Sequence, residues 1–307
     1  MAIVKTDIPT TPKLCEETIL ALAGRYPAFS TELLTITAYA RPIRSLILGT
    51  GARKVLFTAA HHANEWITTP VLLKFMEELA QAAEEGRTLG GVDASTLLEQ
   101  VTIVAVPMVD PDGVALVTGE LKPDDPGYAA AREISENFPQ IPFPDGWKAN
   151  LSGVDLNLNY PAGWLQAREI KFMQGFDRPA PRDYVGRAPL NQPETRALAA
   201  YTEYIDPALV LAFHSQGQVI YWQFDDIFIP GAEELGQRLA QVSGYALEDT
   251  PYNSAFAGYK DWFIQEFRRP GYTVEVGSGE NPLPLSQFPE IYRDNLGILV
   301  IAALGGI

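Results

Sequence analysis

Hydrophobic residues along the chain alternate between runs with helical spacing and short runs typical of buried strands. Helical spacing of apolar residues predicts helices over residues 16–26, 66–83, 193–205 and 231–242, and a last helix from residue 289. Apolar, β-branched runs bounded by turn residues predict strands at residues 33–37, 43–48, 55–59, 101–107, 208–214, 219–224 and 272–276. We therefore expect an α/β fold with three α/β/α layers and a mixed, largely parallel sheet, with any ligand site at the carboxyl ends of its strands.

Proline, glycine, aspartate and asparagine dominate residues 110–193, so we expect long loops with little secondary structure there. Loops of that length within a domain are usually functional. Residues 1–12 are polar and predict a leader or the stub of a linker, and residues 13–307 predict a single domain. The apolar stretch 296–307 is shorter than the ~20 residues of a bilayer span, which predicts a buried C-terminal helix.

Composition excludes several classes of protein. The chain is 47% apolar and 20% charged, as in ordinary globular domains. Its net charge of −15 disfavours binding to nucleic acid or to anionic membranes. Cys15 is the single cysteine, so a thiolate metal cluster is excluded and any metal must bind histidine and carboxylate. No apolar segment of signal-peptide length begins the sequence, so we expect a cytoplasmic protein.

The three histidines lie at the ends of two predicted strands. His62 and Glu65 are three residues apart after the strand at 55–59, a spacing that brings both side chains to one face of a helical turn. His214 ends another predicted strand, and could complete a zinc site of two histidines and one glutamate with an open position for water. A His-x-x-Glu match alone is a weak signal and can arise by coincidence.

A zinc site that activates water needs a base, and Glu275 is the candidate. It lies in the predicted strand at 272–276, where an acidic side chain must be paired or face solvent. The alternative is an edge-strand glutamate that points to water.

Seven motifs together resemble the zinc carboxypeptidase family, in the family's order and over nearly the whole chain from about Pro12. They are His62-Ala63-Asn64-Glu65-Trp66, Asp110-Pro111-Asp112-Gly113, Gly153-Val154-Asp155-Leu156-Asn157, Tyr184-Val185-Gly186, Gln192-Pro193-Glu194-Thr195, Phe213-His214-Ser215-Gln216 and Val274-Glu275. Two segments, 61–70 and 280–285, are similar to the branch of bacterial γ-D-glutamyl-L-diamino acid endopeptidases, which act on peptidoglycan peptides.

The resemblance implies one zinc ion per chain on His62, Glu65 and His214, with Glu275 as general base and acid. It also implies that Asp155 accepts the free imidazole N–H of His62, although an Asx-turn is an equally simple explanation of that residue. Residues implied to contact substrate are Asn157, Lys148 and Tyr252, the last in a loop that closes over the substrate. His61 is expected to be structural rather than a ligand.

Two positions depart from the family pattern. Leu158 replaces the arginine that follows Asn157 in carboxypeptidases and grips the terminal carboxylate of the substrate. The family arginine that stabilises the oxyanion lies shortly before the Gly-Val-Asp motif, where this chain has residues 148–152 and Lys148 is the nearest cation. Arg168, Arg178, Arg182 and Arg187 are further candidates for that role, and the sequence does not rank them.

The resemblance implies a zinc metallopeptidase that hydrolyses the γ-D-glutamyl amide of meso-diaminopimelate or lysine in peptidoglycan-derived peptides. Such a substrate would also be compatible with a protein associated with the cell wall. Two alternatives stay open: a zinc amidohydrolase that acts on acylated amino acids, and a non-catalytic module that binds wall peptides.

Overall fold

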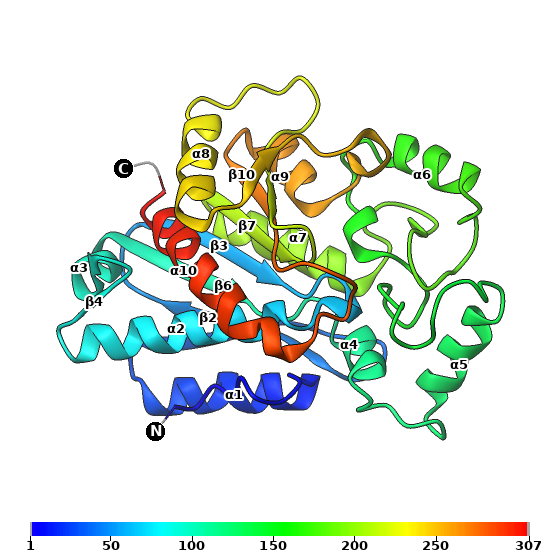
Figure 1. The fold of residues 1–307 in the computed structure, drawn as a ribbon, viewed down its shortest axis with the longest axis horizontal. Helices are drawn as coiled ribbons and strands as arrows, with labels where there is room; N and C mark the ends of the chain where they lie inside the picture. Colours follow the sequence, from blue (N-terminus) through cyan, green and yellow to red (C-terminus); the bar gives the residue numbers. More distant parts are fainter. Residues whose placement is uncertain (1, 306–307) are drawn as a thin grey trace.

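An eight-stranded mixed sheet organises residues 2–305, the part of the chain that the computed structural model describes (Figure 1). In spatial order its strands are β1 (Phe29–Ile36), β2 (Pro42–Leu48), β6 (Val101–Val106), β3 (Arg53–Ala59), β7 (Leu209–His214), β10 (Gly271–Glu275), β8 (Val219–Tyr221) and β9 (Ala246–Glu248). The four central strands, β6, β3, β7 and β10, are parallel, and antiparallel pairing occurs on both sides of them. The predicted mixed sheet is confirmed.

Helices cover both faces of this sheet. One face carries α1 (Pro12–Arg25), α2 (Thr68–Glu84), α3 (Ala94–Gln100), α8 (Ala232–Ser243) and α10 (Phe288–Leu304), and the other carries α7 (Pro193–Ile205) and α9 (Tyr259–Phe267). Side chains alternate between the two cores along each strand: Val55 and Phe57 of β3 pack in the first, and Leu56 packs in the second. Because both faces are apolar, the central strands are nearly continuous hydrophobic runs.

Most predicted elements have shifted ends with local causes. The first helix begins at Pro12 rather than at residue 16, because the Thr11 side chain accepts a hydrogen bond from Leu14 N and proline suits the first helical position. The strand expected at 219–224 ends at Tyr221, where its pairing with β9 ends. The strand expected at 33–37 spans Phe29–Ile36.

The expectation of little secondary structure between residues 110 and 193 was wrong. That segment contains α4 (Pro111–Val117), α5 (Pro126–Ser135) and α6 (Trp164–Met173), besides the short 3-10 helix η2 (Leu156–Leu158). Asp110 caps α4 by accepting a hydrogen bond from Gly113 N at 2.9 Å. Figure 1 places α4, α5 and α6, with their connecting loops, beyond the carboxyl ends of the central strands. Also unpredicted were α3, α9, β9 and the separate hairpin of β4 (Thr88–Leu89) and β5 (Val92–Asp93).

The beginning and end of the described chain lie against the sheet's helices. Ile3 N and Val4 N donate hydrogen bonds to the Glu77 carboxylate of α2, at 2.6 and 3.0 Å. The predicted C-terminal helix is the last part of α10, which ends at Leu304; residues 306–307 lie outside the described part. Within residues 2–305, no helix is long and apolar enough to cross a lipid bilayer.

Candidate active site

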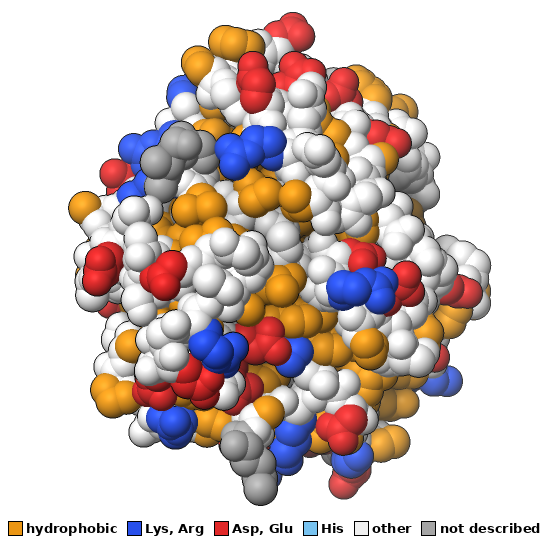
Figure 2. Space-filling view, turned by 60° about the vertical axis from the view of Figure 1, so that its left-hand side comes forward, with side chains coloured by type: hydrophobic (Ala, Val, Ile, Leu, Met, Phe, Trp, Pro, Cys, Tyr) orange, Lys and Arg blue, Asp and Glu red, His pale blue; other side chains and the backbone are white. Residues whose placement is uncertain are grey.

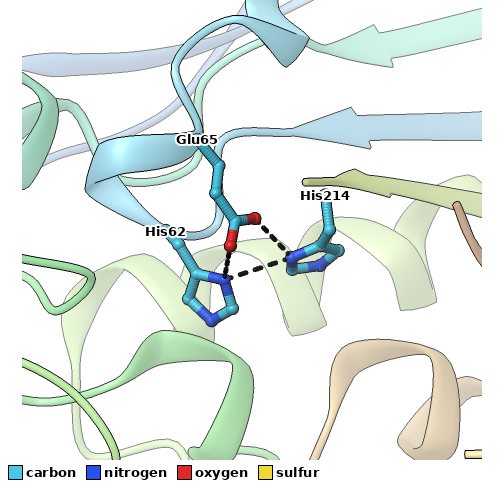
Figure 3. Close-up of side chains that lie close together, drawn as sticks. All are labelled: His62, Glu65 and His214. Atoms are coloured by element: carbon cyan, nitrogen blue, oxygen red, sulfur yellow. Dashed lines mark hydrogen bonds and ion pairs between the residues drawn. The ribbon is translucent and has the colours of Figure 1, made fainter. Parts of the chain in front are cut away.

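Three side chains converge at the carboxyl edge of the sheet. His62 immediately precedes the 3-10 helix η1 (Ala63–Glu65), so one tight turn after β3 brings Glu65 back beside it. His214 is the last residue of β7, which is parallel to β3 and hydrogen-bonded to it. The His62 Nδ1 atom lies 2.9 Å from Glu65 Oε1 and 3.2 Å from His214 Nδ1, and His214 Nδ1 lies 3.0 Å from Glu65 Oε2 (Figure 3).

This triangle of donor atoms fits a divalent cation such as zinc. Zinc binds imidazole nitrogen and carboxylate oxygen at about 2.0–2.2 Å, so neighbouring ligands of a tetrahedral site are about 3.3 Å apart. The three donors form a group suited to metal binding, and all three residues are buried. Two imidazole nitrogens that face each other beside a carboxylate are stabilised when a cation lies between them. The chemistry of this donor set therefore agrees with the zinc that the sequence predicted.

Asp155 lies on the far side of His62. Its Oδ1 atom is 3.0 Å from His62 Nε2, so the proton of a neutral His62 ring belongs on Nε2 and the lone pair on Nδ1 faces Glu65 and His214. Burial opposes the charged imidazole, but Glu65 and Asp155 outweigh it and raise the pKa of His62 to about 9. Burial likewise opposes the ionised Asp155, yet His62 lowers the pKa of this carboxyl. Backbone N–H groups of Asn157 and Asp183 also donate to Asp155.

Glu275 ends β10 directly beside His214 in the parallel register. Its neighbours Val274 and Val276 pack in the core on one face, so Glu275 points to the opposite face, where it is half-buried. Burial, and next the charge of Glu65, raises the pKa of Glu275 to about 8. Such a carboxyl can exchange a proton near neutral pH.

Lys148 is the cation nearest to the three converging side chains. Its Nζ atom lies 2.8 Å from Glu65 Oε1, and its carbonyl accepts a hydrogen bond from Ala63 N. Burial opposes its charge most strongly, but the attraction and hydrogen bond of Glu65, together with the charge of Glu275, outweigh burial and raise the pKa of Lys148. The backbone N–H of Lys148 donates to Pro181 O, which joins this segment to the loop that carries Arg182.

The structure distinguishes the four arginines that the sequence offered as further candidates to stabilise the oxyanion. Arg182 lines the cavity beside Glu275. Arg178 pairs with its neighbour Asp177 at the surface, and Arg168 lies over the rings of α6. Arg187 lines a different hollow. Of the four, Arg182 alone is placed beside the site.

Two cavities meet at Glu275, Lys148 and Arg182. The first, of about 200 Å³, is lined by these residues and by His62, Asp155, Asn157, Leu158, Lys171, Asp183, Tyr221, Thr250, Pro251, Ser254, Gly258, Lys260, Asp261 and Thr273. The second, of about 750 Å³, is lined by the same three and by Asn64, Gln140, Ile141, Pro142, Asp145, Gly146, Ser215, Gln216, Gly279, Glu280, Asn281 and Pro282. A substrate can therefore extend from Glu275, Lys148 and Arg182 into both cavities.

The remaining residues singled out in the sequence lie around the first cavity or beneath it. Asn157 lines it, and its Oδ1 atom accepts a hydrogen bond from Tyr259 N at the start of α9. Tyr252 lies in the 3-10 helix η3 (Tyr252–Ser254), is 63% exposed and accepts a hydrogen bond from Gln166. His61 is buried, and its ring stacks on His214 with centroids 5.5 Å apart.

Sequence reasoning missed four charged residues of the first cavity. Lys171 pairs with Asp183 at 2.6 Å, and Lys260 pairs with Asp261 at 2.6 Å. Both lysines are buried, which is rare for this residue type unless it is paired. In the sequence, Lys260 and Asp261 stand between apolar residues. This pattern is equally typical of an exposed helix surface, so it does not predict that the two side chains are buried in a cavity wall.

Figure 2 shows a face of the molecule near the chain ends. Acidic and basic side chains are dispersed over this face among apolar ones, and no histidine is visible on it. All three histidines are in fact buried. Of the three, His62 lines the first cavity.

Comparison with known proteins agrees with this geometry. The family model for zinc carboxypeptidases (Peptidase M14) matches residues 15–297. The chain is 41% identical over 285 residues to gamma-D-glutamyl-L-diamino acid endopeptidase 1 of Lysinibacillus sphaericus, an alignment that covers 92% of this chain and 69% of the relative.

Solved structures share the fold. Bovine thrombin-activatable fibrinolysis inhibitor, in complex with tick carboxypeptidase inhibitor, superimposes with a TM-score of 0.71 at 17% identity, over 96% of each chain. The murein-tripeptide amidase of Escherichia coli O157 superimposes with a TM-score of 0.55 at 22% identity, over 88% of this chain and 91% of that one. With the family model matching most of its length, the chain belongs to the zinc carboxypeptidase family of metallopeptidases.

Proposed function

We propose that residues 13–307 form one catalytic domain that hydrolyses the γ-D-glutamyl amide bond to a diamino acid in peptidoglycan-derived peptides. The observation that carries this proposal is the convergence of His62, Glu65 and His214 at 2.9–3.2 Å beside the Glu275 carboxyl. The named activity of the Lysinibacillus sphaericus relative supports the choice of bond. Leu158 in the cavity wall supports it too, because leucine cannot grip the terminal carboxylate that carboxypeptidases recognise.

One zinc ion per chain would be held by His62, Glu65 and His214. When bound, zinc supplies a Lewis acid for the scissile carbonyl and lowers the pKa of the attacking water. Asp155 fixes the His62 ring through its Nε2–H, which keeps the lone pair on Nδ1 toward the ion.

The protein's own groups move the proton and stabilise charge. Glu275 accepts a proton from the water that attacks the amide carbon, and then gives it to the departing nitrogen of the diamino acid. The Lys148 ammonium, with the Arg182 guanidinium beside it, stabilises the negative oxygen of the tetrahedral intermediate. Asn157 and the Tyr252 loop lie where they would contact the peptide around the first cavity.

A defined peptide, L-Ala-γ-D-Glu-meso-diaminopimelate, tests the proposal. Mass spectrometry should detect L-Ala-D-Glu and free diaminopimelate as products, and a chelator should abolish their formation until zinc is restored. An N-acyl amino acid offered in parallel should be cleaved far more slowly. Stoichiometric zinc binding with no cleavage of the peptide would contradict the proposal and favour a wall-peptide-binding module; preferential cleavage of the N-acyl amino acid would favour an amidohydrolase.

A further inference from the structure

A buried ion pair forms part of the wall of the first cavity. Lys260 and Asp261 lie in the first turn of α9 and are 4% and 3% exposed. The Lys260 Nζ atom is 2.6 Å from Asp261 Oδ1, 2.5 Å from Gln223 O and 3.5 Å from Thr250 Oγ1. Both residues line the same cavity as His62 and Glu275, so a group bound beside the zinc ligands can reach them within one cavity.

The hydrogen bonds of this pair leave room for a ligand. Asp261 Oδ2 accepts a hydrogen bond from Gly258 N, which fixes the carboxylate to the start of α9. Among residues 2–305, no donor forms a well-aligned hydrogen bond to Asp261 Oδ1, although Lys260 is close to it. An ammonium has three N–H donors, and the Thr250 contact is at the upper limit of a hydrogen bond. One donor of Lys260 and one oxygen of Asp261 can therefore serve a bound molecule.

Two adjacent opposite charges complement a zwitterion. The side chain of meso-diaminopimelate ends in a carbon that carries both an ammonium and a carboxylate, whereas the side chain of lysine ends in an ammonium alone. We propose that Lys260 and Asp261 recognise the distal amino-acid end of diaminopimelate, Lys260 through its carboxylate and Asp261 through its ammonium. This inference rests on the proposed function and chooses between the two diamino acids that the sequence left open.

The same geometry disfavours lysine as the substrate residue. A lysine ammonium placed at Asp261 would lie beside the Lys260 ammonium with no carboxylate between the two cations. Desolvated like charges repel strongly, and the distal carboxylate of diaminopimelate removes that repulsion. Hydroxyl groups of Thr250 and Thr273 in the same wall can bond to either substrate, so they do not discriminate.

Three peptides that differ only in the diamino acid test the inference. Wild-type zinc enzyme should cleave L-Ala-γ-D-Glu-meso-diaminopimelate with a kcat/KM about 10- to 150-fold above that of the L-lysine peptide, the effect of one charge-assisted hydrogen bond. The peptide whose distal carboxylate is an amide should behave like the lysine peptide. Lys260→Met should lower kcat/KM for the diaminopimelate peptide about tenfold or more, and should raise kcat/KM for the other two peptides, because their distal ammonium no longer lies beside the Lys260 charge.

Lys171→Met is the matched control, because it removes another buried, paired lysine from the same cavity. Lys171→Met should preserve the ratio of kcat/KM between the diaminopimelate and lysine peptides. If this variant lost the ratio as fully as Lys260→Met, recognition by Lys260 would be overturned. Equal cleavage of all three peptides by the wild-type enzyme would also overturn it, even if Lys260→Met failed to fold. Cleavage of none of them would instead refute the proposed function, so the two failures are distinguishable.

Discussion

The contact between Asp155 and His62 allows a quantitative test of how the proposed zinc site is supported. Asp155 accepts three N–H groups: His62 Nε2 at 3.0 Å and Asn157 N at 3.2 Å on Oδ1, and Asp183 N at 3.1 Å on Oδ2. Asp155→Asn preserves the shape but leaves one accepting oxygen. Whichever way the new amide turns, its NH₂ group faces an N–H donor, and an unsatisfied buried donor costs about 1–3 kcal/mol.

If the NH₂ group faces His62, the imidazole proton must move to Nδ1, where it blocks the atom that faces Glu65 and His214. If it faces Asp183, the ring keeps its tautomer and loses only a negative partner. We expect zinc affinity to fall about 10- to 100-fold, or about 1.4–2.8 kcal/mol, as for other residues that orient a metal ligand.

Competition with a chromophoric chelator of known affinity would measure this change, with circular dichroism to check the fold. Asp183→Asn is the matched control: it removes a nearby carboxylate that pairs with Lys171 and Arg182, while its backbone N–H still donates to Asp155. The control should retain wild-type zinc affinity. Unchanged affinity in Asp155→Asn, or an equal loss in both variants, would refute the reasoning.

Three further predictions concern catalysis and stability. Glu275→Gln should keep zinc but lower kcat by about 10²–10⁴, whereas His214→Ala should lose both zinc and turnover; normal turnover of the glutamine variant would exclude Glu275 as the base. Lys148→Met should lower kcat about 10²–10³ with a smaller change in KM, and a change in KM alone would assign the lysine to binding. Burial raises the pKa of Glu194 from 4.5 to about 7, so the folded state holds this proton more tightly than the unfolded state. The contribution of Glu194 is therefore fully present below pH 4.5 and is lost as pH rises toward 7, by roughly 3 kcal/mol of unfolding free energy. In urea unfolding of the metal-free protein, the free energy of unfolding should depend less on pH in Glu194→Gln than in the wild type. An equal pH dependence in the two proteins would contradict this prediction.

The sheet and the converging histidines were predictable because they depend on short-range patterns. Strands buried on both faces are apolar runs, so β3, β6, β7 and β10 stand out in the sequence. Parallel strands bring their carboxyl ends to one edge, which places His62 and His214 together although 152 residues separate them. Here the periodicity of the chain and the rules of sheet topology lead to the same arrangement.

The short helices at the end of the sheet were not predictable in the same way. Helix α4 contains Gly113, and α5 begins with Pro126 and Gly127, so each resembles a loop when propensities are considered alone. Their stability comes from tertiary contacts: Ala115 and Leu116 of α4 pack with Trp147 in a separate small core. A sequence read by local pattern does not contain that information.

Residues that select the substrate are harder still to find, because the inward or outward direction of a charged side chain is decided by packing elsewhere. Lys260 and Asp261 turn inward since Tyr259, Trp262 and Phe263 on the same helix occupy the core against the sheet. The proposed zinc ligands lie at or just after the ends of β3 and β7, whereas the wall of the first cavity depends on how α9 packs. It follows that chemistry can be assigned from motifs, while the choice between diaminopimelate and lysine must be argued from the three-dimensional arrangement of α9.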